Sequence, residues 1–254
     1  MGDLTTWFEQ AGYQVRFDWG QDGAARAGAR GDVVVIVDTL RFSTTVAAHL
    51  AAGATVEPRY WKDGADTSLL SPTALLPITG GGERGEPIAL ASPNGAMCCR
   101  AASALGAKAV FAGALVNAST VAAAARALQT PITVIACGEL SSPLSPLLPL
   151  SGGGAGGGGL RFALEDLLGA GAIIAALPHL SSSPEAKTAR AAFLGAKPKL
   201  LTRLLTCGSG IELRDKGLEA DVHYAAQLNS LAVAPCLTDG IFSNTTPPDD
   251  RTLS

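Results

Sequence analysis

Residues 33–45 read VVVIVDTLRFSTT, a run of β-branched residues that ends in an aspartate, an arginine and a cluster of hydroxyls. The length and β-branching of 33–37 predict a buried strand, although periodicity alone does not separate so short an apolar run from a helix. The polar residues that follow have two explanations. They mark the point where the chain leaves the core, or they form a group that handles a charged ligand. That group would consist of Asp38, Arg41, Ser43 and Thr44.

The pattern of a strand followed by a helix repeats along the chain. After the first strand, Ser43 or Thr44 can cap a helix that Gly53 can end. Further segments predict an edge strand at 13–19, strands like the first at 87–91, 108–113 and 131–136, and a last strand at 230–235. Strands that alternate with helices imply crossover connections. The pattern therefore predicts an α/β fold with a mainly parallel sheet.

Polar side chains follow these strands at or soon after their carboxyl ends. In open α/β sheets, ligands bind in the crevice outside the carboxyl ends of the strands. Several polar strand ends on one rim favour a functional site over a simple exit of the chain from the core. The rim predicted in this way consists of Asp38, Arg41, Asn94, Asn117 and Glu139.

The carboxylates of the chain favour one kind of cofactor. Asp38 and Glu139 lie at strand ends, and Glu165 and Asp166 interrupt the apolar segment 160–177, which predicts a long helix. A solvated helix face would explain the second pair equally well. Oxygen-rich sites suit Mg²⁺, which is typically held by one or two carboxylates together with substrate phosphate. An arginine at the same rim can clamp an oxyanion with its bidentate fork.

Composition and missing motifs exclude several other classes of protein. The formal net charge of −3, without a basic stripe, argues against nucleic-acid binding, which needs clustered Lys and Arg. No apolar stretch approaches the roughly 20 residues that span a bilayer. The five cysteines lack C-x-x-C spacing and indicate reduced thiols in a cytoplasmic protein. Zincin, α/β-hydrolase and P-loop motifs are absent, and Leu40 stands where a phosphatase with a nucleophilic aspartate at position 38 would need its second aspartate.

The 254 residues, 47 % of them apolar, suffice for one large α/β domain, which we place at 1–241. The segment 151–159, SGGGAGGGG, matches a dinucleotide fingerprint only trivially, because no strand leads into it, and it predicts a flexible loop. Residues 242–254 predict a disordered tail. Ala-rich surfaces favour a homo-oligomer.

Several segments in order resemble the 2-phosphosulfolactate phosphatase family: VDTLRFSTT, SPNGA, AGALVNA, CGE, LEDLLGAGAII and, at 209–235, SGIELRDKGLEADVHYAAQLNSLAVAP. The resemblance covers the chain from Asp32 to Ile241. It implies a three-layer α/β/α fold and a Mg²⁺-dependent phosphoric monoester hydrolase. The implied substrate is a small phosphorylated acid, 2-phosphosulfolactate, which yields 3-sulfolactate in a step toward coenzyme M.

The resemblance also assigns roles to residues of this chain. The expected catalytic residues are Asp38, Arg41 and Glu139, and the expected Mg²⁺ ligands are Asp38, Glu139 and Asp166. The residues expected to position the phosphate and sulfonate groups are Ser43, Thr44, Asn94, Gly95 and Asn117. Glu212 and Asp221 are expected to cap or pair within the C-terminal helices. The identity of the general base stays open.

Two departures from the family pattern fall on expected substrate contacts. The Gly-Glu-Arg and Asn-Ser-Pro blocks that usually precede the second strand are reduced to LLSPTALL at 69–76, and the usual Asn-Gly-Thr reads Asn-Gly-Ala at 94–96. Two alternatives therefore stand beside the phosphatase. One is a non-catalytic protein that binds small anions on the same scaffold, and the other is a phosphoryl-transfer enzyme with a different substrate.

Overall fold

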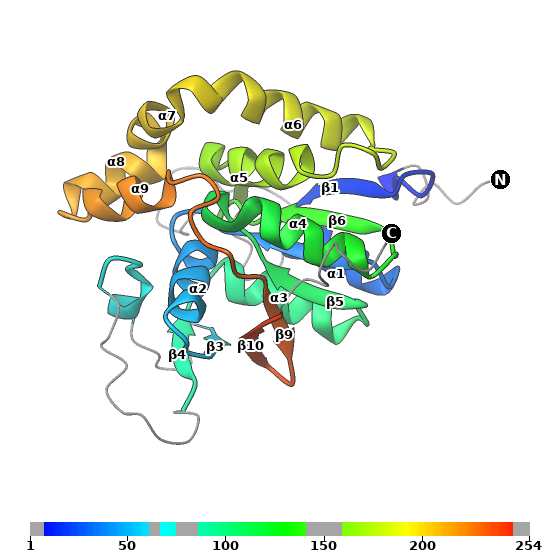
Figure 1. Cartoon of the computed structure of the whole chain (residues 1–254), viewed down its shortest axis with the longest axis horizontal. Coiled ribbons are helices and arrows are strands. Elements are labelled where there is room, and N and C mark those ends of the chain that lie inside the picture. The colour runs from blue at the N-terminus through cyan, green and yellow to red at the C-terminus, as the bar shows by residue number, and fades with distance from the viewer. Residues whose placement is uncertain (1–7, 61–66, 75–85, 141–158, 246–254) are drawn as a thin grey trace.

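The computed structural model describes residues 8–60, 67–74, 86–140 and 159–245. The main strands are β1 (Val15–Trp19), β2 (Val33–Val37), β3 (Val56–Arg59), β4 (Ile88–Ala91), β5 (Ala109–Ala112), β6 (Ile132–Ala136), β9 (Pro235–Thr238) and β10 (Ile241–Asn244). They form one sheet in the order β1-β6-β2-β5-β9-β10-β3-β4, which runs through the centre of the molecule (Figure 1). Neighbours are parallel from β1 to β5 and between β3 and β4, whereas the β9–β10 hairpin is antiparallel to the strands beside it.

Helices cover the sheet on both faces. They are α1 (Gly20–Ala29), α2 (Phe42–Ala51), α3 (Gly95–Ala104), α4 (Ala118–Ala127), α5 (Leu164–Ala175), α6 (Pro184–Ala196), α7 (Leu200–Thr206), α8 (Gly208–Asp215) and α9 (Glu219–Ala225). Short 3₁₀ turns are η3 (Thr67–Leu70), η4 (Leu115–Asn117) and η5 (Lys197–Lys199), and a separate two-stranded sheet joins β7 (Glu139–Leu140) to β8 (Leu160–Arg161).

Strand β2 shows how the layers arise from the sequence. Side chains alternate between the two faces of a strand. Val33, Val35 and Val37 belong to the core shared with α4 and α5, whereas Val34 and Ile36 belong to the core shared with α1, α2 and α3. Because both faces are covered, every residue of β2 is buried, which explains its unbroken β-branched run. The predicted three-layer α/β/α architecture with a mainly parallel sheet is confirmed.

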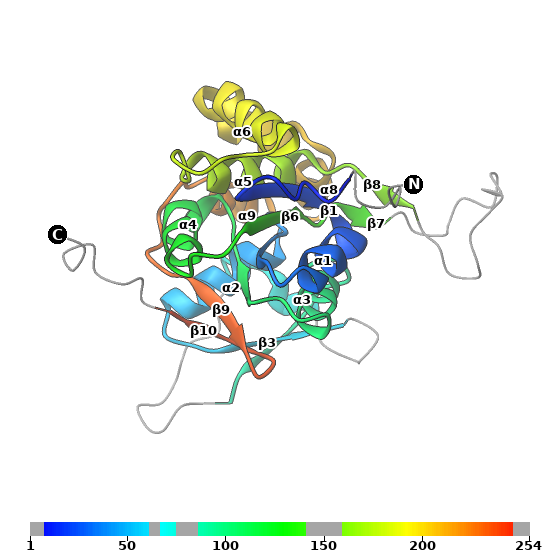
Figure 2. The same cartoon turned by 90° about the vertical axis from the view of Figure 1, so that its right-hand side faces the viewer.

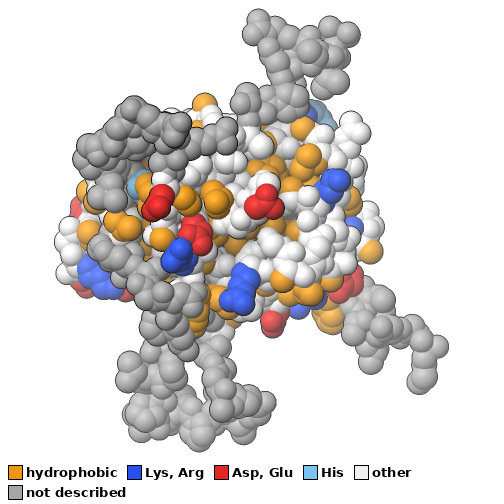
Figure 3. All heavy atoms as spheres, turned by 90° about the horizontal axis from the view of Figure 1, so that it is seen from below, with side chains coloured by type: hydrophobic (Ala, Val, Ile, Leu, Met, Phe, Trp, Pro, Cys, Tyr) orange, Lys and Arg blue, Asp and Glu red, His pale blue; other side chains and the backbone are white. Residues whose placement is uncertain are grey.

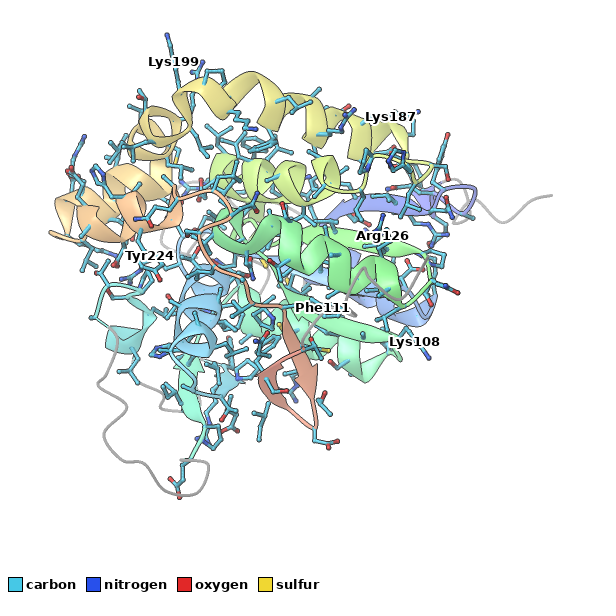
Figure 4. All side chains as sticks on the ribbon, viewed as in Figure 1. Lys108, Phe111, Arg126, Lys187, Lys199 and Tyr224 are labelled. Carbon is cyan, nitrogen blue, oxygen red and sulfur yellow. The ribbon has the colours of Figure 1, made fainter. Side chains whose placement is uncertain are left out.

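Helix α6 forms an additional layer outside α5, as Figures 1 and 2 show. Its N-terminus is capped by Ser183, whose Oγ accepts a hydrogen bond from the Ala186 N–H at 3.1 Å. On its outer side, Lys187 of α6 and Lys199 of η5 extend away from the sheet (Figure 4). This layer matters for the site because it holds α5, and α5 supplies two of the clustered carboxylates.

Most predicted strands are confirmed, and three boundaries need correction. The segment 13–19 contains the edge strand β1, as predicted. The predicted last strand at 230–235 is not a strand before β9 begins at 235. Here the Asn229 and Leu231 N–H groups donate to the carbonyls of Leu115 and Val116, which belong to η4 and not to a strand. The helix predicted over 160–177 begins only at 164, since 160–161 pairs with β7.

The predicted tail begins too early. Residues 242–244 lie in β10, where Phe242 is fully buried against the ring of Phe42. The predicted glycine loop lies outside the described residues except for Gly159. All five cysteines are free. Within the described ranges, none of the helices combines the length and apolarity that crossing a membrane would require.

Candidate active site

Asp38 comes directly after β2 and is buried at the start of helix α3. Its Oδ2 accepts hydrogen bonds from Ser92 Oγ and from the Gly95 N–H, both at 3.1 Å, and its Oδ1 accepts one from the Phe42 N–H at 3.3 Å. Backbone N–H groups at helix N-termini favour negative charge. The chain therefore holds this carboxylate in one orientation from three sides.

Gly95 permits this contact because it has no side chain. A Cβ at this position would lie 2.2 Å from Phe42 Cδ1 and 2.9 Å from Asp38 Oδ2, closer than real carbon atoms approach. The sequence predicted Gly95 as a substrate contact. The structure places its N–H on the Asp38 carboxylate.

Ser43 and Thr44, which the sequence predicted as substrate contacts, hold the turn after β2. Ser43 Oγ donates to the Ile36 carbonyl and accepts from the Asp38 N–H, both at 3.0 Å, and Thr44 Oγ1 donates to the Thr39 carbonyl at 2.8 Å. Both side chains are fully buried. The prediction that one of them caps the next helix is wrong, because α2 starts before Ser43 and no side-chain hydrogen bond caps it.

Asn117 also serves the backbone rather than a ligand. The side chain is fully buried; Oδ1 accepts from the Ala114 N–H at 2.8 Å, and Nδ2 donates to the carbonyls of Ala112 and Val233 at 3.3 Å. These bonds satisfy both ends of the amide. The expected role of Asn117 in substrate binding therefore finds no support in its contacts.

Asp166 ties the ends of two neighbouring strands together from the first turn of α5. Its Oδ1 accepts from the Thr39 N–H after β2 at 2.8 Å, and its Oδ2 accepts from the Gly138 N–H after β6 at 2.9 Å. Helix α5 comes this close because Gly169 faces the strand: a Cβ there would lie 2.5 Å from Thr39 Oγ1 and 2.8 Å from Val37 Cγ1.

Glu139 and Glu165 meet at the hydroxyl of Ser209, which belongs to helix α8. Ser209 Oγ hydrogen-bonds Glu165 Oε1 and lies 3.4 Å from Glu139 Oε1. Asn94 Nδ2 donates to Glu139 Oε2 at 3.1 Å. The other end of that amide, Asn94 Oδ1, is buried and has no hydrogen-bond partner among the described residues. A buried amide oxygen without a partner can accept a hydrogen bond from a ligand or bind a cation, which makes Asn94 Oδ1 a candidate ligand contact.

The pKa values of Asp38, Glu139 and Asp166 are raised by burial and by neighbouring carboxylates. The pKa of Glu139 is raised to about 7, mainly by burial and secondly by the charge of Asp38, while the hydrogen bond from Asn94 lowers it. Burial, followed by the charges of Asp38 and Glu165, raises the pKa of Asp166 well above its ordinary value. The pKa of Asp38 is also raised, mainly by burial and with a contribution from Glu165. No described Lys or Arg forms an ion pair with any of these four carboxylates, so the described residues supply no balancing positive charge to the cluster.

Arg41, three residues after Asp38, is held by a buried partner on helix α9. Asp221 Oδ2 accepts from Arg41 Nη1 at 2.8 Å, while Oδ1 accepts from Ser71 Oγ at 2.7 Å and from Thr73 Oγ1 at 2.6 Å. Asp221 was expected to pair within the C-terminal helices, and this expectation is wrong. It joins the turn after β2 to the segment that follows η3, whereas Glu212 does pair within its own region, with Lys216 at 2.5 Å.

The predicted rim is thus only partly assembled as expected. Of the predicted residues, hydrogen bonds or mutual charge effects join Asp38, Asn94, Gly95, Glu139 and Asp166. The sequence interpretation missed the roles of Ser92 and Ser209, and it counted Glu165 among the carboxylates that suit Mg²⁺ without placing it among the expected ligands. Ser92 follows β4 directly, so the strand-end rule could have found it. Ser209 begins the C-terminal segment that resembles the family, but no local pattern joins it to Glu165, 44 residues away, or to Glu139, 70 residues away.

One hollow of the surface lies away from this cluster. A hollow of about 820 Å³ lies over α3, β3 and the β9–β10 turn, and none of the four carboxylates lines it. On the face in Figure 3, acidic and basic side chains of the described residues are interspersed, with hydrophobic atoms between them. That face offers no extended patch of one charge.

The sequence of this chain is similar to those of known proteins. The family model described as 2-phosphosulpholactate phosphatase matches residues 70–240. A probable 2-phosphosulfolactate phosphatase of Thermus thermophilus is 31% identical over 229 residues, which cover 81% of this chain and 88% of the relative. Proteins of the same description from Carboxydothermus hydrogenoformans and Symbiobacterium thermophilum are 29% and 26% identical, over 82% and 83% of this chain and 87% and 93% of the relatives.

Proposed function

This chain belongs to the 2-phosphosulfolactate phosphatase family, and we propose that it hydrolyses a small phosphorylated acid, 2-phosphosulfolactate, to 3-sulfolactate and phosphate. The observation that carries the proposal is the cluster of carboxylates at the strand ends, with which no Lys or Arg of the described ranges forms an ion pair. The cluster consists of Asp38, Glu139, Glu165 and Asp166. Such a cluster repels a phosphate ester unless a cation lies between them, so we propose Mg²⁺ as the cofactor.

The donor atoms present suit Mg²⁺. They are carboxylate oxygens and the unpartnered amide oxygen of Asn94, and Mg²⁺ prefers oxygen ligands. In the described ranges, no three Asp, Glu, His or Cys side chains are already arranged around a metal position. Mg²⁺ does not need such a set, because it usually keeps several waters and takes one or two carboxylates together with substrate phosphate.

The hydrogen bonds suggest which carboxylates would hold the ion. Both oxygens of Asp38 and of Asp166 already accept backbone N–H groups, whereas Glu139 and Glu165 bond only to side chains, those of Asn94 and Ser209. We therefore assign Glu139 and Glu165 as the ligands that would contact Mg²⁺. Asp38 would add negative charge nearby, and Asp166 would position the two strand ends. When bound, the ion would neutralise charge on the phosphoryl oxygens.

The chain's own residues would supply the remaining chemistry. Glu139 is partly exposed, and its pKa of about 7 belongs to the metal-free chain. A bound cation would lower that pKa, so the ionised carboxylate would be available to hold Mg²⁺. Asn94 would hold that carboxylate in place through Oε2. Arg41 uses one of its N–H groups on Asp221, which leaves others of the guanidinium for a phosphate oxygen.

The test is phosphate release from a panel of small phosphoacids, with Mg²⁺, with Mn²⁺ and with excess chelator. We expect turnover of 2-phosphosulfolactate that falls by about two decades or more in chelator and in Glu139→Gln. Glu185→Gln, a change at an exposed carboxylate of α6, should retain activity. Full activity in chelator would refute the metal. Binding of the ester without any phosphate release would instead support the non-catalytic anion-binding protein.

A further inference from the structure

The proposed substrate carries acidic groups besides the phosphate that is transferred. In 2-phosphosulfolactate these are a sulfonate and a carboxylate. The only described basic side chain tied to this region by an ion pair is Arg41, which Asp221 already engages. The following inference rests on the proposed function and concerns what binds the second oxyanion.

The two-stranded sheet beside the site places a second arginine there. In this antiparallel pair, Glu139 of β7 lies directly opposite Arg161 of β8. Residues directly opposite each other in such a pair project from the same face. Glu139 is directed to Asn94 and Ser209 in the carboxylate cluster. The side chain of Arg161 therefore leaves the ribbon on the side of the cluster.

The neighbour of Arg161 supports this orientation. Leu160 packs over the opposite side, where its side-chain carbons lie against Gly20 and Gly138, within 2.9 Å of where their Cβ atoms would be. Successive side chains of a strand point to opposite faces. Packing of Leu160 on these glycines fixes the ribbon, and with it the direction in which Arg161 leaves the backbone.

Arg161 is also free to bind a ligand. It is exposed, and no described acidic residue forms an ion pair with it, not even Glu139 opposite. A guanidinium presents paired N–H donors that match the oxygens of a sulfonate or carboxylate. Its positive charge would also offset part of the repulsion between four carboxylates and an anionic substrate.

We propose that Arg161 is a specificity residue that binds the non-transferred oxyanion of the substrate, either its sulfonate or its carboxylate. Arg161 does not take part in cleavage of the phosphate ester. It selects a phosphorylated acid with a second negative group over a simple phosphate monoester. Its contribution belongs to substrate binding and not to the chemical step.

The test compares Arg161→Gln with the wild type on three esters. These are 2-phosphosulfolactate, 2-phospholactate (without the sulfonate) and the phosphate ester of 2-hydroxyethanesulfonate (without the carboxylate). We expect KM for 2-phosphosulfolactate to rise about tenfold, equivalent to ~1.4 kcal/mol, with kcat unchanged within about twofold. KM should be unaffected for the ester that lacks the group bound by Arg161, which identifies that group. Arg161→Lys should recover part of the loss.

The matched control is Arg190→Gln, at an exposed arginine of α6, which should leave KM unchanged. An unchanged KM in Arg161→Gln, an equal rise for all three esters, or a fall in kcat alone would overturn the proposal. If the wild type hydrolyses none of the esters, the proposed function fails, and calorimetric binding of 3-sulfolactate then tests Arg161 directly. Tighter or equal binding by Arg161→Gln, or no binding by the wild type, overturns it there.

Discussion

Replacement of Asp221 by asparagine should weaken the fold and loosen substrate binding together. The Asp221 side chain is 0% exposed, and it accepts hydrogen bonds from Arg41, Ser71 and Thr73. In Asp221→Asn the remaining oxygen can still serve the two hydroxyls. The new NH₂ group then faces Arg41 Nη1, so that two donors meet and the buried charge is lost.

The size of the effect follows from burial. Removal of one partner from a fully buried ion pair costs about 3–5 kcal/mol. The Arg41 side chain keeps 16% exposure and can turn partly toward water, so we expect a loss of about 2–3 kcal/mol in the free energy of unfolding. For a chain of this length, 1 kcal/mol corresponds to roughly 2–4 °C in Tm, which gives a fall of about 4–12 °C. Arg41 would also lose its fixed orientation, so KM should rise by about tenfold or more.

The assay is a thermal melt beside steady-state kinetics, with Glu219→Gln as the control. Glu219 lies on the same helix but is exposed, with His223 Nε2 3.4 Å away, so its replacement should shift Tm by no more than about 1 °C. The double variant Asp221→Asn/Arg41→Gln should be less destabilised than the sum of its single changes, because the two residues interact directly. Additive losses, or a melt of Asp221→Asn that matches the control, would refute the reasoning.

Two further predictions concern the carboxylate cluster. Because the pKa of Glu139 is raised to about 7, the folded chain keeps a proton at pH 5–7 that the unfolded chain releases, so the free energy of unfolding without metal should fall as pH rises through this range. Melts across pH should show a shallower fall in Glu139→Gln, and an unchanged slope would contradict the assignment. Gly95→Ala should lower both Tm and kcat/KM, since its Cβ would overlap Phe42 and press on Asp38 at a cost of about 1–3 kcal/mol. The control is Gly12→Ala, because no atom lies within 4 Å of a Cβ at that position. An equal Tm for Gly95→Ala and Gly12→Ala would show that Phe42 and Asp38 move aside at little cost in stability.

The sequence predicts the strands and helices of this fold better than it predicts which strands pair with each other. Strands β2, β4, β5 and β6 are visible because each is a short apolar run before a helical segment. The sheet order is not visible, because pairing depends on tertiary packing. Strand β4 lies at the far edge from β1, yet the turn after it reaches back to Asp38 through Ser92 and Gly95. No local pattern specifies that return.

The strand-end rule locates the site but cannot assign roles within it. It finds Asp38, Glu139 and Asn94 because carboxyl ends of parallel strands meet at one rim. The same rule also selects Asn117, and Ser43 was predicted as a site residue because its hydroxyl lies just beyond a strand end. Both side chains instead hydrogen-bond the backbone, because amides and hydroxyls at strand ends bind the backbone as readily as a ligand. Only burial and bonding partners separate the two uses, and both are properties of the folded chain.

The C-terminal helices explain why so much of the site is hidden from local sequence. Ser209 of α8 closes a loop of 70 residues to Glu139, and Asp221 of α9 closes one of 180 residues to Arg41. Both contacts meet groups at the ends of early strands, so those groups lack their partners until α8 and α9 have packed against them. Ordering such distant segments costs conformational entropy that local structure does not repay. The contacts of Ser209 and Asp221 therefore form together with the last part of the fold, and an N-terminal fragment that ends soon after Glu139 still lacks them.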